Sequence, residues 1–170
     1  MTATTTNESA SVTSGATVDR TSDRELVVTR TINAPARIVF DAWTKPELFQ
    51  RWWVPRSMPM RLVTCEMDVR VGGGYRLVFD YDGSTFEFFG KYIEVTPPSR
   101  LAWTNDEGGG EQVTTVTFDE RDGRTHLTIH DLYPSKEALD RAIASGSTGG
   151  LPEQLEQLDE LLATLDTSEA

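Results

Sequence analysis

Cysteine is nearly absent from this chain of 170 residues, in which Cys65 stands alone. A single cysteine cannot form an internal disulfide, and chains without disulfides are typical of reducing compartments. We therefore expect a cytoplasmic protein in which the thiol of Cys65 is a buried structural group. Long apolar runs are absent too, since none approaches the roughly 18 residues of a membrane-spanning helix. The sequence thus predicts a protein that does not cross a membrane.

Basic residues are also scarce: 16 Lys and Arg stand against 27 Asp and Glu, and the net charge is −11. Nucleic acids and anionic membrane surfaces recruit proteins through clustered Lys and Arg, so we expect neither as a partner. The acids concentrate in residues 134–170, where eight acids accompany two basic residues. A solvated helix face is our first interpretation of this cluster, and an acidic docking surface for a basic partner is the second.

Recognisable catalytic and metal-binding patterns are missing as well. The two histidines, His126 and His130, lie on a predicted strand, where four residues span about 13 Å. Ligands so far apart cannot share a zinc ion that binds at about 2 Å. The glycine runs at residues 72–74 and 108–110 are not followed by the Lys-Ser/Thr of a phosphate-binding loop. We therefore expect no metal, no cofactor and no catalytic residue set.

Residues 1–23 consist mostly of Thr, Ser, Ala and Gly and contain no aromatic residue. Such a segment has almost nothing to bury against the entropy lost on ordering, so the sequence predicts a disordered N-terminal tail here. Residues 24–166 are long enough for one core, and we expect them to form a single domain.

Within that domain, the hydrophobic pattern changes along the chain. A strand at residues 25–33 precedes two short helices at residues 35–43 and 47–53. Six further strands, separated by Gly and Pro turns, are predicted at residues 60–69, 75–81, 84–95, 100–105, 112–118 and 125–131. The chain ends in a helix with an apolar stripe of Leu151, Leu155, Leu158, Leu162 and Leu165. This order predicts an α+β fold, in which a curved antiparallel sheet of about seven strands packs its concave face on the C-terminal helix.

Aromatic residues follow the inner face of this predicted sheet. A sheet curved around one helix leaves space at its open end, where an apolar ligand can enter. The candidate ligand-binding residues are Trp52, Trp53, Phe79, Tyr81, Phe86, Phe88, Trp103, Leu151 and Leu155. We expect residues 51–53 (RWW) to cover the mouth. A core filled entirely by side chains is the alternative interpretation.

Several local motifs carry a resemblance to a known family. They are residues 30–35 (RTINAP), 39–44 (VFDAWT), 51–53 (RWW), 68–73 (DVRVGG), 90–95 (GKYIEV) and 98–101 (PSRL). Their order resembles the family named after the activator of the heat-shock-protein-90 ATPase. This family lies within the START-like, helix-grip superfamily (SRPBCC), which is also called polyketide-cyclase-like. The resemblance implies the helix-grip fold and a ligand or partner domain.

Three functions remain open. The first is binding of a small hydrophobic or aromatic ligand. The second is a polyketide cyclase- or dehydratase-like enzyme in which Tyr81 or Asp68 moves protons, although an ion pair with Arg70 is the more natural role of Asp68. The third, contact with a chaperone ATPase, follows from the family name, but residues 1–23 stand where the eukaryotic activator has an additional chaperone-binding domain. An exposed edge strand could also pair two copies in a homodimer.

Overall fold

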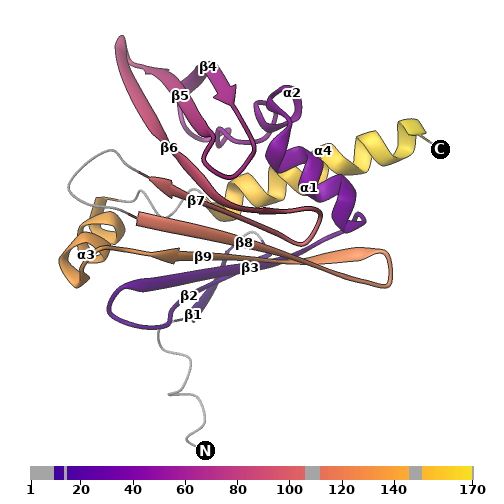
Figure 1. Ribbon diagram of the computed structural model, residues 1–170, viewed down its shortest axis with the longest axis horizontal. Helices are drawn as coiled ribbons and strands as arrows, with labels where there is room; N and C mark the ends of the chain where they lie inside the picture. The colour runs from indigo at the N-terminus through magenta and orange to yellow at the C-terminus, as the bar shows by residue number, and fades with distance from the viewer. Residues whose placement is uncertain (1–9, 14, 106–111, 146–150, 170) are drawn as a thin grey trace, which may run out of the picture.

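The computed structural model describes residues 10–13, 15–105, 112–145 and 151–169 (Figure 1). The protein is α+β, with one open antiparallel sheet and a C-terminal helix. The strands are β1 (Ala10–Thr13), β2 (Ala16–Arg20), β3 (Glu25–Ile32), β4 (Met60–Met67), β5 (Gly74–Tyr81), β6 (Ser84–Thr96), β7 (Arg100–Asn105), β8 (Gln112–Arg121) and β9 (Arg124–Leu132). The helices are α1 (Ala36–Thr44), α2 (Pro46–Phe49), α3 (Lys136–Ser145) and α4 (Leu151–Glu169). The glycine run at residues 108–110 lies outside the described residues.

The sheet runs in the order β1-β2-β3-β9-β8-β7-β6-β5-β4. Its described part has nine strands, so the expectation of about seven strands was wrong. The two additional strands, β1 and β2, lie inside the segment predicted to be disordered, and that prediction was wrong for residues 10–13 and 16–20. The edge of β3 explains both results, because β2 pairs with it antiparallel and the side chain of Ala16 is fully buried there. The composition of this segment offers few residues for a core, but composition does not show that β2 can pair with the open edge of β3.

Two of the predicted glycine turns are found in the sheet, each as an Asp-Gly pair. Asp82 and Gly83 have φ angles of 52° and 80°, and they join β5 to β6. Asp122 and Gly123 have φ angles of 56° and 79°, and they join β8 to β9. Positive φ at both central residues matches the twist of the flanking strands.

The core lies between the sheet and helices α1, α2 and α4. Helix α4 packs against β2, β3 and α1. Its leucine stripe enters the main hydrophobic cluster through Leu155, Leu158 and Leu162, each of which is fully buried. The side chain of Leu165 lies outside the described part of the helix. The predicted stripe therefore does bury α4 through these three leucines.

Part of the acidic cluster fastens α4 to the rest of the protein. The Oδ2 atom of Asp159 accepts a hydrogen bond from Nη2 of Arg30 on β3 at 3.1 Å. Glu153 accepts hydrogen bonds from the backbone N–H and the hydroxyl group of Ser57, at 3.0 and 2.6 Å. The interpretation of these acids as a purely solvated helix face was wrong for Asp159 and Glu153, because the partners come from segments more than 90 residues away in the sequence.

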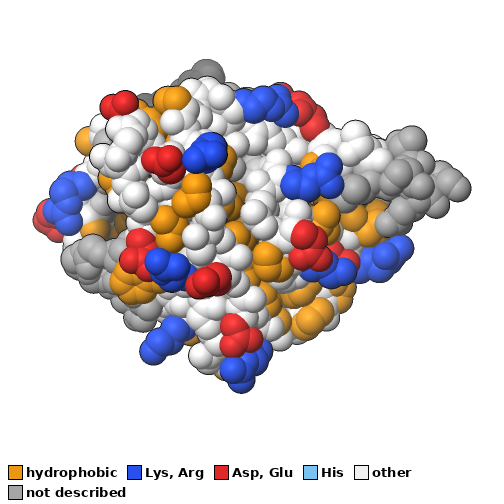
Figure 2. All heavy atoms as spheres, turned by 90° about the horizontal axis from the view of Figure 1, so that it is seen from above, with side chains coloured by type: hydrophobic (Ala, Val, Ile, Leu, Met, Phe, Trp, Pro, Cys, Tyr) orange, Lys and Arg blue, Asp and Glu red, His pale blue; other side chains and the backbone are white. Residues whose placement is uncertain are grey.

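Charged side chains of both signs are interspersed on the face of the molecule that Figure 2 presents. Exposed ion pairs such as that between Arg61 and Asp80, at 3.5 Å, stabilise a fold by about 1 kcal/mol at most. Among the described helices, none combines the length and the apolar character that crossing a membrane requires.

Candidate ligand-binding pocket

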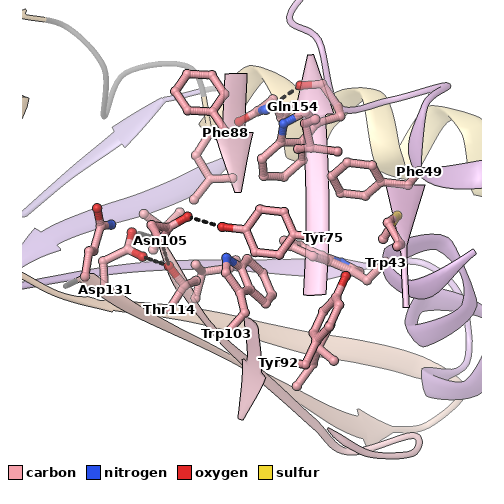
Figure 3. Close-up of a pocket in the computed structure, with 18 of the residues that line it drawn as sticks. Trp43, Phe49, Tyr75, Phe88, Tyr92, Trp103, Asn105, Thr114, Asp131 and Gln154 are labelled. Atoms are coloured by element: carbon pink, nitrogen blue, oxygen red, sulfur yellow. Dashed lines mark hydrogen bonds between the residues drawn. The ribbon is translucent and has the colours of Figure 1, made fainter. Parts of the chain in front are cut away.

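A pocket of about 350 Å³ lies between the sheet and the helices (Figure 3). Its walls come from the inward faces of seven strands, β3 to β9, and from α1, α2 and α4. The antiparallel register places one inward side chain per strand in rows that cross the sheet. The central row consists of Tyr92 on β6, Trp103 on β7, Thr114 on β8, Asp131 on β9 and Leu26 on β3. All five side chains line the pocket.

The rows on either side of the central row differ in polarity. On one side, Leu101, Ile129 and Val28 continue the apolar core. On the other side, Asn105 lies opposite Gln112. In Figure 3, Asn105, Thr114 and Asp131 gather at one end of the pocket, and Trp43 and Phe49 lie towards the other. The pocket is thus apolar along most of its length and polar at one end.

A chain of hydrogen bonds crosses this polar end. The Tyr75 hydroxyl group lies 2.8 Å from the carbonyl oxygen of Thr104 and 2.7 Å from Oδ1 of Asn105. Nδ2 of Asn105 donates to Oγ1 of Thr114 at 3.2 Å. The Thr114 hydroxyl group donates in turn to Oδ1 of Asp131 at 2.5 Å. These bonds fix the direction in which each polar group meets the pocket.

Asp131 is the one charged side chain among the described residues that line the pocket. Burial raises its pKa above the usual range for Asp, while hydrogen bonds from Thr114 and Gln112 and the nearby charge of His130 act in the opposite direction. Burial is the largest of these effects, because a carboxylate loses its hydration in the pocket.

The raised pKa of Asp131 has a consequence for stability. The folded state holds the proton more tightly than the unfolded chain, so the stability that Asp131 contributes is complete below the unfolded pKa and is lost as pH rises through the folded pKa. We expect Asp131→Asn to gain thermal stability relative to the natural protein as pH rises from about 4 to about 7, by a few degrees. Calorimetry across this range measures the difference. Asp122→Asn, at an exposed turn, is the control for the loss of one negative charge. A difference that stays constant with pH would contradict this assignment.

The apolar end contains a buried donor with no partner. Trp43 on α1 lines the pocket and is 2% exposed, and its indole N–H has no hydrogen-bond partner among the described residues. Its ring packs on Trp103 at a centroid distance of 5.8 Å. A buried donor without a partner costs about 1–3 kcal/mol. An acceptor atom inside the pocket would remove that cost.

Four of the nine sequence-predicted site residues line the pocket: Trp53, Phe88, Trp103 and Leu151. They come from the loop after α2, from β6, from β7 and from the first turn of α4. The structure therefore brings together segments that are about 100 residues apart in the sequence.

Three predicted site residues are buried in the packed core and do not line the pocket. Trp52, Phe79 and Leu155 are at most 2% exposed. The indole N–H of Trp52 donates to the carbonyl oxygen of Ala42 at 3.0 Å, which directs its ring into the core. The expectation that both tryptophans of residues 51–53 cover a mouth was wrong for Trp52.

The remaining two predicted site residues, Tyr81 and Phe86, lie outside the pocket with 39% and 46% of their surface exposed. They share a face of the sheet with Phe79 and Phe88, as predicted, and their rings are 6.3 Å apart. They lie next to the turn of the β5–β6 hairpin, whose end projects from the body of the molecule (Figure 1). Periodicity gives the face of a strand, but it does not show where the helices cease to cover that face.

The polar residues of the pocket were missed at the sequence level. Asp131 follows Leu127 and Ile129 at intervals of two, so the alternation of β9 places all three on the same face. A charged residue at an inward position of a strand is unusual, and this pattern could have identified Asp131 as a candidate site residue. Asn105 and Gln112 carried no such signal, since each stands at a strand end beside the glycine run.

The groups considered for catalysis lie elsewhere. The predicted ion pair between Asp68 and Arg70 is present, with Nε of Arg70 at 2.9 Å from Oδ2 of Asp68. Neither Asp68 nor Tyr81 lines the pocket between the sheet and the helices, so this pair of residues does not support proton transfer there. Burial raises the pKa of the Cys65 thiol to about 11, which keeps the thiol protonated and unreactive at neutral pH.

Comparisons with known proteins agree with this architecture. The family model described as "Activator of Hsp90 ATPase homolog 1-like protein" matches residues 33–163. A crystal structure from Rhodobacter sphaeroides is 27% identical, with a TM-score of 0.81 over 88% of this chain and 99% of that one. A crystal structure from Nitrosomonas europaea is 24% identical, with a TM-score of 0.78 over 87% of this chain and 99% of that one. Among curated proteins, no sequence matches the chain.

Proposed function

Because the chain belongs to the family of activator of Hsp90 ATPase homolog 1-like proteins, we propose that it binds a small hydrophobic or aromatic molecule in the pocket between the sheet and α4. The single observation that carries this proposal is the pocket itself: about 350 Å³ of space lined by eight aromatic side chains. They are Trp43, Phe49, Trp53, Tyr75, Phe88, Tyr92, Trp103 and Tyr133.

Two features of the pocket support a ligand over a core filled by side chains. Protein interiors pack densely and leave few voids larger than a water molecule, whereas this space falls in the size range of small-molecule sites. The unpartnered N–H of Trp43 also offers a hydrogen bond that no described side chain accepts. In this proposal the sheet and α4 grip the ligand between them, with Leu151 and Gln154 of α4 forming one wall.

A neutral aromatic probe tests the proposal. N-phenyl-1-naphthylamine fluoresces when it leaves water, and we expect it to bind the full-length protein saturably at one site. We expect Trp103→Ala to weaken this binding by about tenfold, because the indole of Trp103 lines the pocket and an apolar contact of this size contributes about 1.4 kcal/mol or more. Fluorescence titration measures both affinities.

Phe86→Ala is the matched control, since Phe86 is an exposed aromatic residue outside the pocket. It should bind the probe as the natural protein does. Equal weakening in both variants, or no saturable binding by the natural protein, would contradict the proposal.

A further inference from the structure

The carboxylate of Asp131 has no cationic partner. The ion pairs of the described residues do not include Asp131, and no Lys or Arg is among the described residues that line the pocket. Its contacts are neutral donors, the hydroxyl group of Thr114 at 2.5 Å and the amide of Gln112. Asp131 is partly buried, and a carboxylate that loses its hydration in this way is normally paired with a cation or a metal ion. Asp131 therefore lacks the partner that its position calls for.

Asp131 faces the pocket, so a cation that pairs with it can come from a ligand. The register of β9 places it inward beside Thr114, in the row that contains Trp103 and Tyr92. His130, the neighbouring residue that could carry positive charge, pairs instead with Glu25 at 2.8 Å. No group of three or more metal-ligating side chains occurs among the described residues. The pocket thus presents one carboxylate without a cation supplied by the described part of the chain.

The walls around this carboxylate also suit a cation. Trp103 lies two strands from Asp131 in the central row, a separation of about 10 Å. Tyr133 lines the same end of the pocket as Asp131. The faces of Trp and Tyr rings attract ammonium groups, by up to about 2 kcal/mol where water is excluded. An ammonium group at Asp131 would therefore lie at the end of the pocket that Tyr133 lines, and an aromatic body would reach Trp103.

We propose that the pocket selects a small organic cation, namely a protonated amine on an aromatic body, with the ammonium group at Asp131 and the body against Trp103 and Leu101. This inference rests on the proposed function and specifies the chemical class of the ligand. A carboxylate ligand is disfavoured, because it would meet Asp131 and no Lys or Arg of the described lining. The net charge of −11 favours the approach of cations in the same way.

The state of Asp131 in the empty protein agrees with this assignment. Burial raises its pKa, which means that the pocket by itself holds the negative charge poorly. An adjacent ammonium group would offset that effect and keep the carboxylate ionised. A bound cation would thus add to the hydrogen bonds from Thr114 and Gln112 that already stabilise the carboxylate of Asp131.

Three naphthalene compounds of matched size test the inference at pH 7 by isothermal titration calorimetry. They are 1-naphthylmethylamine, which is cationic, 1-naphthalenemethanol, which is neutral, and 1-naphthylacetate, which is anionic. We expect the amine to bind the full-length protein at least about tenfold more tightly than the alcohol, and the acetate to give no measurable binding.

The variant Asp131→Asn separates charge recognition from the shape of the pocket. We expect it to lose about tenfold in affinity for the amine while its affinity for the alcohol changes by less than about threefold. Retained binding of the alcohol shows at the same time that the variant is folded. Equal affinities of the natural protein for the amine and the alcohol, or an unchanged amine affinity in Asp131→Asn, would overturn the cation inference and leave the pocket proposal standing. If none of the three compounds binds, both proposals fail.

Discussion

Replacing Gln157 with alanine is expected to lower the free energy of unfolding by about 3 kcal/mol. Gln157 lies on α4 and is 6% exposed. Its Nε2 donates to the carbonyl oxygens of Trp52 and Val54 at 3.0 and 2.8 Å, and its Oε1 accepts from the backbone N–H of Arg56 at 2.7 Å. One side chain thus satisfies three backbone groups of the loop that carries the pocket tryptophan Trp53.

The size of this effect follows from what the alanine variant leaves behind. Each buried polar group without a partner costs about 1–3 kcal/mol, and water can reach only part of this loop. Urea unfolding measures the difference. Glu156→Ala changes the neighbouring residue on the same helix and serves as the control, with an expected change within about 0.5 kcal/mol. A loss below about 1 kcal/mol in Gln157→Ala would show that the loop does not depend on this side chain.

Replacing Gly90 with alanine is expected to cost more than about 4 kcal/mol or to prevent folding. A Cβ atom at this position would lie 1.8 Å from the carbonyl oxygen of Thr104 and 2.9 Å from Cε2 of Tyr75. The first of these contacts is with backbone, so no rotamer change relieves it, and β6 and β7 would have to move apart. This movement would also break the hydrogen bond from the Tyr75 hydroxyl group to the carbonyl oxygen of Thr104.

Gly74→Ala is the matched control for this substitution. Gly74 lies on the paired strand β5, and a Cβ atom there would lie 3.2 Å from the carbonyl oxygen of Gly90. That contact is tight but needs a shift of only a few tenths of an ångström. Thermal unfolding of the two variants should therefore differ widely. Similar melting temperatures for Gly90→Ala and Gly74→Ala would contradict the close approach of β6 to β7.

The sequence carried enough information for most of the fold. The Asp82-Gly83 and Asp122-Gly123 turns, the alternating strands and the leucine stripe of α4 are local signals, and each is found in the structure. The strands β1 and β2 were missed because their stability comes from the edge of β3 and not from their own composition. Local propensity cannot report a partner that lies elsewhere in the chain.

The residues of the candidate site were harder to predict from the sequence than the fold. Trp52 and Trp53 are adjacent, yet one is fully buried in the core and the other lines the pocket. That difference depends on the hydrogen bond between Trp52 and Ala42, which is a tertiary contact. Asp131 was missed for a different reason. A search for catalytic motifs does not consider a single acidic residue at an inward position of a strand.

The most direct test of ligand binding in this pocket uses the four tryptophans of the chain as reporters. Three of them, Trp43, Trp53 and Trp103, line the pocket, whereas Trp52 lies in the core with its N–H bonded to Ala42. In ¹H–¹⁵N spectra of the labelled protein, titration with N-phenyl-1-naphthylamine should shift the indole signals of the three lining tryptophans saturably and that of Trp52 least. Unchanged positions of all four signals, or a shift confined to Trp52, would contradict ligand binding in this pocket.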